Sequence, residues 1–358
     1  MINRLWKRIA VLGVILVVTV VLMVQVVAAQ EITPYPGIIY ISTDAAGMTD
    51  DGVAYDAYDI VGRVPYLNGG SPTADDAYAW FKLFDGEDYG LGSVHNINGF
   101  SIEWAEMVPC GGIGVDCVAP EPPASPLDDV EALYLSFDFT ARHVPGITDK
   151  VRGQDIVVLH PNDINPSVVT DGDFEVYFDG SDVGLTTIAE KIDGLDVWPA
   201  DMIPNDVSLP EDCHAGLIFV STQGAYRVPT PGGSLVGDGS DILVFCATNL
   251  GNDTAGFWFR GFDSSELNVT PKHAITGIDV LDLLPNSPDG QVDDEAVDLL
   301  FGFIARQTFT ADNAVGGPSE LFAADSGSFI AGPADDFNQT WPALNGTATG
   351  LSLGDYQY

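Results

Sequence analysis

Short apolar segments recur along the chain from about residue 37 onward, and polar stretches separate them. Each segment is rich in Ile, Val, Tyr, Phe and Trp and is bounded by Gly, Pro, Asn or Asp, a pattern typical of β-strands. Only residues 187–191 and 293–300 have a pattern that fits a short turn of helix. The pattern therefore predicts an all-β chain.

The segments repeat in a fixed order, and one stretch marks the repeat. Residues 174–185 read FEVYFDGSDVGL, residues 80–91 read WFKLFDGEDYGL, and residues 257–267 carry the weaker copy FWFRGFDSSEL. Two apolar segments precede this stretch in each copy and one follows it, so each copy holds about four strands. The Phe-Asp step of the stretch falls at Phe84, Phe178 and Phe262, and we call this stretch the landmark of its copy. The segment that precedes the landmark contains an Asp-Ile step, at residues 58–61, 155–159 and 241–245.

Four strands repeated about four times predict a β-propeller-like ring of four-stranded repeats. A β-sandwich and an open array of β-repeats are the alternatives. The fourth copy lacks a clear last strand, whereas residues 32–36 stand alone before the first copy, so we expect the N-terminal strand to complete the last repeat. The copies cover approximately residues 37–105, 131–200, 216–285 and 297–358, and a Pro- and Cys-containing insert covers residues 106–128.

The first 29 residues have the three-part pattern of a secretory signal peptide. Three basic residues precede an apolar run over residues 9–27. We expect cleavage after Ala29; the alternative is an uncleaved signal anchor, because the run is nearly long enough to span a bilayer. In both cases the basic flank stays inside the cell. Residues 30–358 are then expected to form a single extracellular domain, secreted or anchored at the cell surface by residues 9–29.

The charge of the chain excludes some partners. There are 52 acidic side chains against 13 basic ones, and the formal net charge is −39. Such a surface repels phosphate backbones and anionic lipid, so nucleic acid is not an expected partner. Because 46% of the residues are hydrophobic, the chain can still bury a core. Cations, whether bound at sites or screening the surface, would relieve the self-repulsion.

The four cysteines fit an oxidising compartment, where disulfides form and persist. Cys110 and Cys117 bracket a flexible glycine-rich loop, so we expect them to pair with each other. Cys213 precedes one predicted strand and Cys246 ends the next, so antiparallel pairing of these strands would bring the two cysteines together. Free thiols or a metal site are the alternative, against which stands the lack of any Cys-x-x-Cys spacing.

Three pieces of the second and third copies carry a resemblance. They are YFDGSDVGL at residues 177–185, IDGLDV at residues 192–197 and LIFVST at residues 217–222. Together they resemble a repeat that occurs in tandem in secreted, Asp-rich bacterial β-proteins, most of which have no assigned function. The resemblance covers most of residues 37–285 and departs from the pattern where Ser264 replaces Gly. It implies an extracellular β-repeat protein and carries over no catalytic residues.

The repeated stretch also carries carboxylates three residues apart, which suggests that each repeat binds calcium. Ca²⁺ takes about six to eight oxygen ligands from carboxylates, carbonyls and water, and an Asp-Gly-x-Asp turn can supply several of them. The alternative is a β-turn in which Asp caps backbone N–H groups and Gly adopts a positive φ. The candidate Ca²⁺ ligands are Asp85, Asp88, Asp179, Asp182, Asp263 and Glu266.

The repeated stretch is distributed over the copies, which favours a non-enzymatic extracellular binding or surface-structural protein. Extracellular carbohydrate or a cell-surface protein is the partner we expect. The sequence contains no Gly-x-Ser-x-Gly elbow, phosphate-binding glycine loop or His-Glu-x-x-His motif, so no catalytic residue is assigned. The alternative is a secreted enzyme that acts on polysaccharide, with its site at one mouth of the ring.

Overall fold

The structure is a computed structural model, and the residues it describes all belong to the unit Ile38–Tyr358. The expected signal segment 1–29 and the expected N-terminal strand 32–36 lie outside the described residues. The described residues are 39–49, 52–64, 79–104, 127, 130–140, 142–161, 174–203, 213–263, 274–280, 297–304, 309–311, 314–316, 320–326, 337–345 and 356–357.

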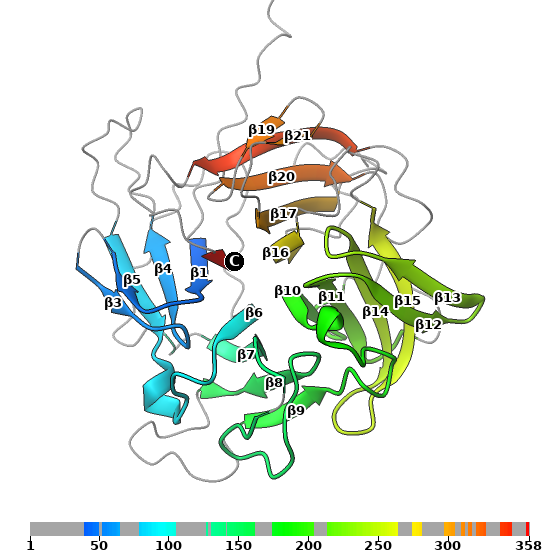
Figure 1. The fold of residues 1–358 in the computed structure, drawn as a ribbon, viewed down its shortest axis with the longest axis horizontal. Coiled ribbons are helices and arrows are strands. Elements are labelled where there is room, and N and C mark those ends of the chain that lie inside the picture. The colour runs from blue at the N-terminus through cyan, green and yellow to red at the C-terminus, as the bar shows by residue number, and fades with distance from the viewer. Residues whose placement is uncertain are drawn as a thin grey trace, which may run out of the picture. The chain divides into compact units, whose positions relative to one another are not determined.

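The described part of the chain is all-β, as predicted (Figure 1). Two short 3₁₀ turns interrupt the strands, η1 (Gly86–Tyr89) and η3 (Ile188–Glu190). The second of them lies where the sequence predicted a turn of helix. For residues 293–300 the alternative to a helical turn, that they lead into the first segment of the fourth copy, is confirmed over their described part: strand β17 (Val297–Ile304) begins there and pairs with neighbours on both sides. Among the described residues, no helix is long and apolar enough to cross a membrane.

Four antiparallel sheets of four strands each make up most of the fold, and Figure 1 colours them in chain order. The first has the order β22-β1-β4-β5 (Tyr356–Gln357, Ile39–Thr43, Ile60–Val64, Ala79–Phe84). The second is β6-β7-β8-β9 (Ile97–Trp104, Val130–Phe137, Ile156–Leu159, Phe174–Phe178). The third is β10-β11-β14-β15 (Ile192–Pro199, Gly216–Thr222, Ile242–Asn249, Ala255–Phe262). The fourth is β16-β17-β20-β21 (Ala274–Val280, Val297–Ile304, Glu320–Ser326, Phe337–Asn345).

Three two-stranded hairpins lie within the connections between these strands. Each is antiparallel and joins strands that are consecutive in the chain. The hairpins are β2-β3 (Gly47–Met48, Ala54–Tyr55), β12-β13 (Tyr226–Thr230, Gly233–Gly237) and β18-β19 (Phe309–Ala311, Ala314–Gly316).

The sheets are offset by one strand from the copies seen in the sequence. The last segment of each copy does not pair with the landmark strand before it but opens the next sheet, as β6 does by pairing with β7. The first sheet receives its remaining strand from the other end of the chain. Ser42 of β1 pairs with Gln357 of β22, and Thr43 pairs with Tyr356. The added strand, β22, therefore comes from the C-terminal end of the chain and joins the first sheet, whereas the sequence predicted an N-terminal strand added to the last repeat.

The repeat itself is confirmed by the register of the strands. In three sheets the landmark phenylalanine lies opposite the isoleucine of the Asp-Ile segment, and a bulge follows immediately. All six side chains are fully buried, so the same contact is built three times from the same residue types. The pairs are Phe84 with Ile60, Phe178 with Ile156 and Phe262 with Ile242.

The core is formed where successive sheets pack face to face. One apolar cluster draws residues from the first and second sheets, and another draws them from the second and third. Trp80 and Trp258 are both buried. The Trp258 indole also donates a hydrogen bond to the carbonyl oxygen of Val183, at 2.9 Å. This bond fixes the landmark loop of the second copy against the third sheet.

Candidate functional site

The landmark loops have the same backbone design in the first two copies. Asp85 and Asp179 each follow the landmark strand, and one carboxylate oxygen of each accepts a hydrogen bond from the backbone N–H two residues later, at 3.3 and 2.9 Å. The loop then closes through Leu91 and Leu185, whose N–H groups donate to the carbonyl oxygens of Gly86 and Gly180, both at 2.8 Å. Asp85 and Asp179 thus cap turns, the alternative that the sequence left open.

A second repeated carboxylate lies beneath each loop, and sequence reasoning missed its role. The aspartates of the Asp-Ile segments are Asp59, Asp155 and Asp241, and they are 2%, 6% and 4% exposed. Each accepts a hydrogen bond from the backbone N–H three residues earlier, at 2.8, 2.7 and 3.2 Å. The recurring Asp-Ile step was visible in the sequence, but it was interpreted only as the start of a strand.

The buried aspartates also hold the landmark loops in place. Asp59 accepts a hydrogen bond from the Gly86 N–H at 3.0 Å, and Asp155 accepts one from the Gly180 N–H at 3.1 Å. Buried carboxylates need such donors, because an unpaired charge inside a protein is costly. In the first two copies, therefore, one aspartate orders two turns that are far apart in sequence.

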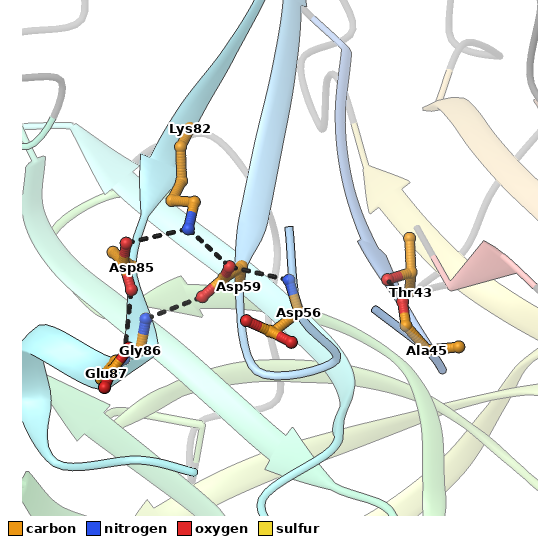
Figure 2. A network of polar contacts seen from close by, with 8 residues as sticks. All are labelled: Thr43, Ala45, Asp56, Asp59, Lys82, Asp85, Gly86 and Glu87. Atoms are coloured by element: carbon orange, nitrogen blue, oxygen red, sulfur yellow. Dashed lines mark hydrogen bonds and ion pairs between the residues drawn. The ribbon is translucent and has the colours of Figure 1, made fainter. Parts of the chain in front are cut away.

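The copies differ in how these carboxylates are neutralised. In the first copy the Lys82 ammonium lies between Asp59 and Asp85 and is 2.8 Å from a carboxylate oxygen of each (Figure 2). Burial lowers the pKa of Lys82, but the hydrogen bonds and charges of the two aspartates outweigh it and raise the pKa. In the third copy Arg260 occupies the same register position and pairs with Asp263. Both copies therefore place a cation of the protein at the acidic turn.

The second copy has Val176 at that register position. No charge in the chain equivalent to Lys82 therefore lies on the strand beside Asp155 and Asp179. Burial raises the pKa of Asp155 to about 6, and the negative charge of Asp179 adds to this effect, whereas the N–H donors of Arg152 and Gly180 and the charge of Arg152 oppose it. Among the described residues, the second copy therefore has no cation that bridges its two carboxylates as Lys82 does in the first.

The candidate calcium ligands take different positions. Asp85 and Asp263 form ion pairs with protein cations, Asp179 caps its turn, and Asp88 and Asp182 are exposed. Glu266 lies outside the described residues. Among the described residues, no group of three or more His, Cys, Asp or Glu side chains is arranged to hold a metal ion. Calcium binding at these turns stays a prediction, and it would require backbone carbonyls and water as further ligands.

One disulfide prediction is confirmed. Cys213 and Cys246 are bonded, with their Cα atoms 5.0 Å apart. The reason is the expected one: Cys246 pairs with Leu217 across the antiparallel strands β11 and β14, and Cys213 lies three residues before the start of β11. Cys110 and Cys117 lie outside the described residues, so their pairing stays a prediction.

A carboxyl at the end of β6 was not singled out from the sequence. Glu103 is partly buried and accepts a hydrogen bond of 2.6 Å from the Tyr134 hydroxyl. Burial raises the pKa of Glu103; the charges of Glu131 and Asp201 also raise it, and the Tyr134 hydrogen bond lowers it. A carboxyl with a raised pKa beside tyrosines is chemically able to donate a proton.

The chain matches none of the protein-family models and none of the curated proteins with which it was compared. The resemblance to secreted Asp-rich bacterial repeats therefore stays a prediction, and the function rests on the geometry described above.

Proposed function

We propose that the protein is a non-enzymatic extracellular binding or surface-structural protein, built as a β-propeller-like ring of four sheets. The observation that carries this proposal is the repetition of one turn design. Asp59 and Asp155 hold the landmark loops of their copies through the same bonds, and Asp241 repeats the bond to the preceding turn. A scaffold needs such equivalent modules, and the difference in the second copy, Val176 in place of a cation, leaves the Asp155–Gly180 bond intact.

Contacts between successive sheets support the ring. The first strands of the second and third sheets are joined by hydrogen bonds from Asn98 to Asp193, at 3.1 Å, and from Ser101 to Asp196, at 2.8 Å. Pairing of β22 with β1 gives the first sheet its fourth strand from the opposite end of the chain. Closure of this kind is how propellers protect their terminal sheets from exposing an edge.

An extracellular location is supported by the Cys213–Cys246 disulfide, because reducing compartments do not maintain such bonds. The net charge of −39 agrees with a protein that works in a cation-rich medium rather than at a nucleic acid. Extracellular carbohydrate and cell-surface protein remain the partner classes we propose.

The polysaccharide-active alternative is favoured by one observation, the raised pKa of Glu103 beside Tyr134. Glycosidases commonly use one carboxylic acid with a raised pKa as the general acid. Glu103 would be that acid, and a second carboxylate such as Asp201 would lie within its electrostatic reach.

The two functions are separated by measuring binding and turnover on the same secreted protein. On a glycan array and in a cell-surface adhesion assay we expect binding, and on a panel of polysaccharide substrates we expect no turnover. Glu103→Gln should leave binding unchanged. Turnover that Glu103→Gln abolishes, with binding retained, would instead establish the enzyme.

Calcium stabilisation is a separate prediction of the proposal. Saturating Ca²⁺ is expected to raise the melting temperature relative to chelator, with a stabilisation of about 2–3 kcal/mol at roughly one hundred times the dissociation constant. The comparison is made at constant ionic strength, so that NaCl controls for screening. Asp182→Asn should weaken the effect, whereas Asp253→Asn, which removes an exposed charge outside the landmark loops, should not. An unchanged melting temperature would remove the calcium claim and leave the acidic turns as structural caps.

A further inference from the structure

The first strands of three sheets carry the same irregularity. In β6, β10 and β16 the register slips after the first pairs, which leaves one extra residue in a β-bulge followed by glycine. Bulge residues lie outside the regular hydrogen-bond ladder. The three are polar and almost completely buried: Asn98 is 0%, Asp193 1% and Thr276 0% exposed.

The glycines bring neighbouring strands into close contact. A Cβ atom at Gly99 would lie 3.1 Å from the Cβ of Leu195 on β10. A Cβ atom at Gly194 would lie 3.1 Å from the backbone nitrogen of Gly277 on β16. Since each bulge residue directly precedes its glycine, the bulges of adjacent strands are neighbours. The Asn98 amide accordingly donates a hydrogen bond to one carboxylate oxygen of Asp193, at 3.1 Å.

At the next junction, between β10 and β16, the polar atoms of the bulge residues are not all hydrogen-bonded in this way. The second carboxylate oxygen of Asp193 and the hydroxyl oxygen of Thr276 are both buried, and no described residue gives either of them a hydrogen-bond partner. Leaving such atoms unpaired costs free energy, and the cost is greatest for a charged group. Asp193 and Thr276 directly precede Gly194 and Gly277, whose backbones are in close contact, so the two bulges are neighbours and one small ligand between them would serve both atoms.

The charged groups that act on Asp193 do not neutralise it. They are Asp138 and Lys191, and these two form an ion pair with each other at 2.6 Å. Lys191 therefore divides its charge between two carboxylates. A water molecule would supply a hydrogen bond to Asp193 but no positive charge, whereas a cation supplies both a ligand bond and the missing charge.

We propose that Asp193 and Thr276 bind a monovalent cation, Na⁺ or K⁺, buried between β10 and β16. The two oxygen ligands suit a hard cation, and a single carboxylate matches a single positive charge. A divalent ion would draw on several carboxylates, and the described residues provide no such group. Nothing in this inference depends on the landmark turns or on the proposed binding function.

The ionisation of Asp193 sets the conditions for the test. Burial raises the pKa of Asp193 to about 7, with a further rise from the Asp138 charge, opposed by the Asn98 hydrogen bond and the Lys191 charge. The cation needs the ionised carboxylate and therefore competes with the proton. The test is therefore made at pH 8, where the carboxylate is ionised even before the cation binds.

The experiment compares thermal unfolding at pH 8 in NaCl, KCl and choline chloride of equal ionic strength. Choline screens charge equally but is too large for a buried site. We expect a saturable rise of the melting temperature, of roughly 3 °C, with the small cation only. Asp193→Asn should abolish this rise without unfolding the protein, because the first copy already carries Asn98 at the equivalent bulge.

Two further variants separate the site from general screening. Thr276→Val removes one ligand and should weaken the small-cation effect, whereas Asp253→Asn removes an exposed charge outside the landmark loops and should retain it. In crystals grown with Tl⁺, an anomalous peak is expected beside Asp193 and should be lost in Asp193→Asn. Equal melting temperatures in NaCl and choline chloride, or a sodium effect that survives Asp193→Asn, would overturn the proposal. A water molecule beside Asp193, with no anomalous signal in the Tl⁺ crystals, would also overturn it.

Discussion

Replacing Gly180 with alanine is expected to destabilise the protein by about 2–4 kcal/mol, because the new methyl group has no room. A Cβ atom at Gly180 would lie 2.2 Å from the carbonyl oxygen of Gln154. The backbone cannot withdraw freely, since the Gly180 N–H is bonded to the buried Asp155. Gly86 is in the same situation, 2.3 Å from the carbonyl oxygen of Tyr58. Chemical denaturation of Gly180→Ala and the parent chain measures the loss.

The control is Gly92→Ala. A Cβ atom at Gly92 has no atom within 4 Å, so this variant should unfold within about 1 kcal/mol of the parent. A comparable loss in both variants would show that the cost arises from backbone freedom in general rather than from the close contact with Gln154.

The second large effect is expected from Val176→Lys. This change gives the second copy the residue that the first copy has at the same register position, where Lys82 bridges two carboxylates. Val176 and Lys82 are both partly exposed, so the longer side chain has room to reach Asp155 and Asp179. The new ammonium should lower the pKa of Asp155 from about 6 toward its ordinary value of 3.8.

The sign of the pH dependence follows from the raised pKa of Asp155. Because the folded chain holds this proton more tightly than the unfolded chain, its stabilisation is fully present below pH 3.8 and is lost as the pH rises through about 6. Above that window, the free energy of unfolding is lower by about 3 kcal/mol than it is below pH 3.8. Val176→Lys should recover most of it at pH 8 and flatten the profile between about pH 4 and 6.

Val176→Met is the matched control, since it lengthens the side chain without adding charge. Its stability should follow the same pH profile as the parent chain. Free energies of unfolding measured across pH 3.5 to about 8 test the prediction, and it fails if Val176→Lys keeps the slope of the parent.

The strands were predictable because each is a short apolar segment with polar boundaries, and the landmark fixed their register. Phe178 opposite Ile156 repeats Phe84 opposite Ile60, as the recurrence of both residues implied. The offset of one strand was not predictable. A strand such as β6 carries no local signal that tells whether it pairs with the strand before it or after it, since both pairings bury the same apolar face.

The site was predictable in part. The acidic turns were found because Asp85 and Asp179 stand out in the repeated stretch, but their partners were not. Asp155 holds the landmark loop by accepting a hydrogen bond from the Gly180 N–H, and only the fold brings these two residues together. One signal was present and unused: aligning the landmark strands shows Lys82, Val176 and Arg260 at one position, which already marks the second copy as different.

The pairing of β1 with β22 has a consequence for how the protein matures. Residues 42 and 357 are joined in one ladder, and a contact of such sequence separation forms late because a very long loop must close first. Until residues 356–357 join the sheet, β1 keeps one open side. Recruitment of β1 by a neighbouring molecule is therefore most favoured while the chain is still folding, and pairing with β22 ends that exposure.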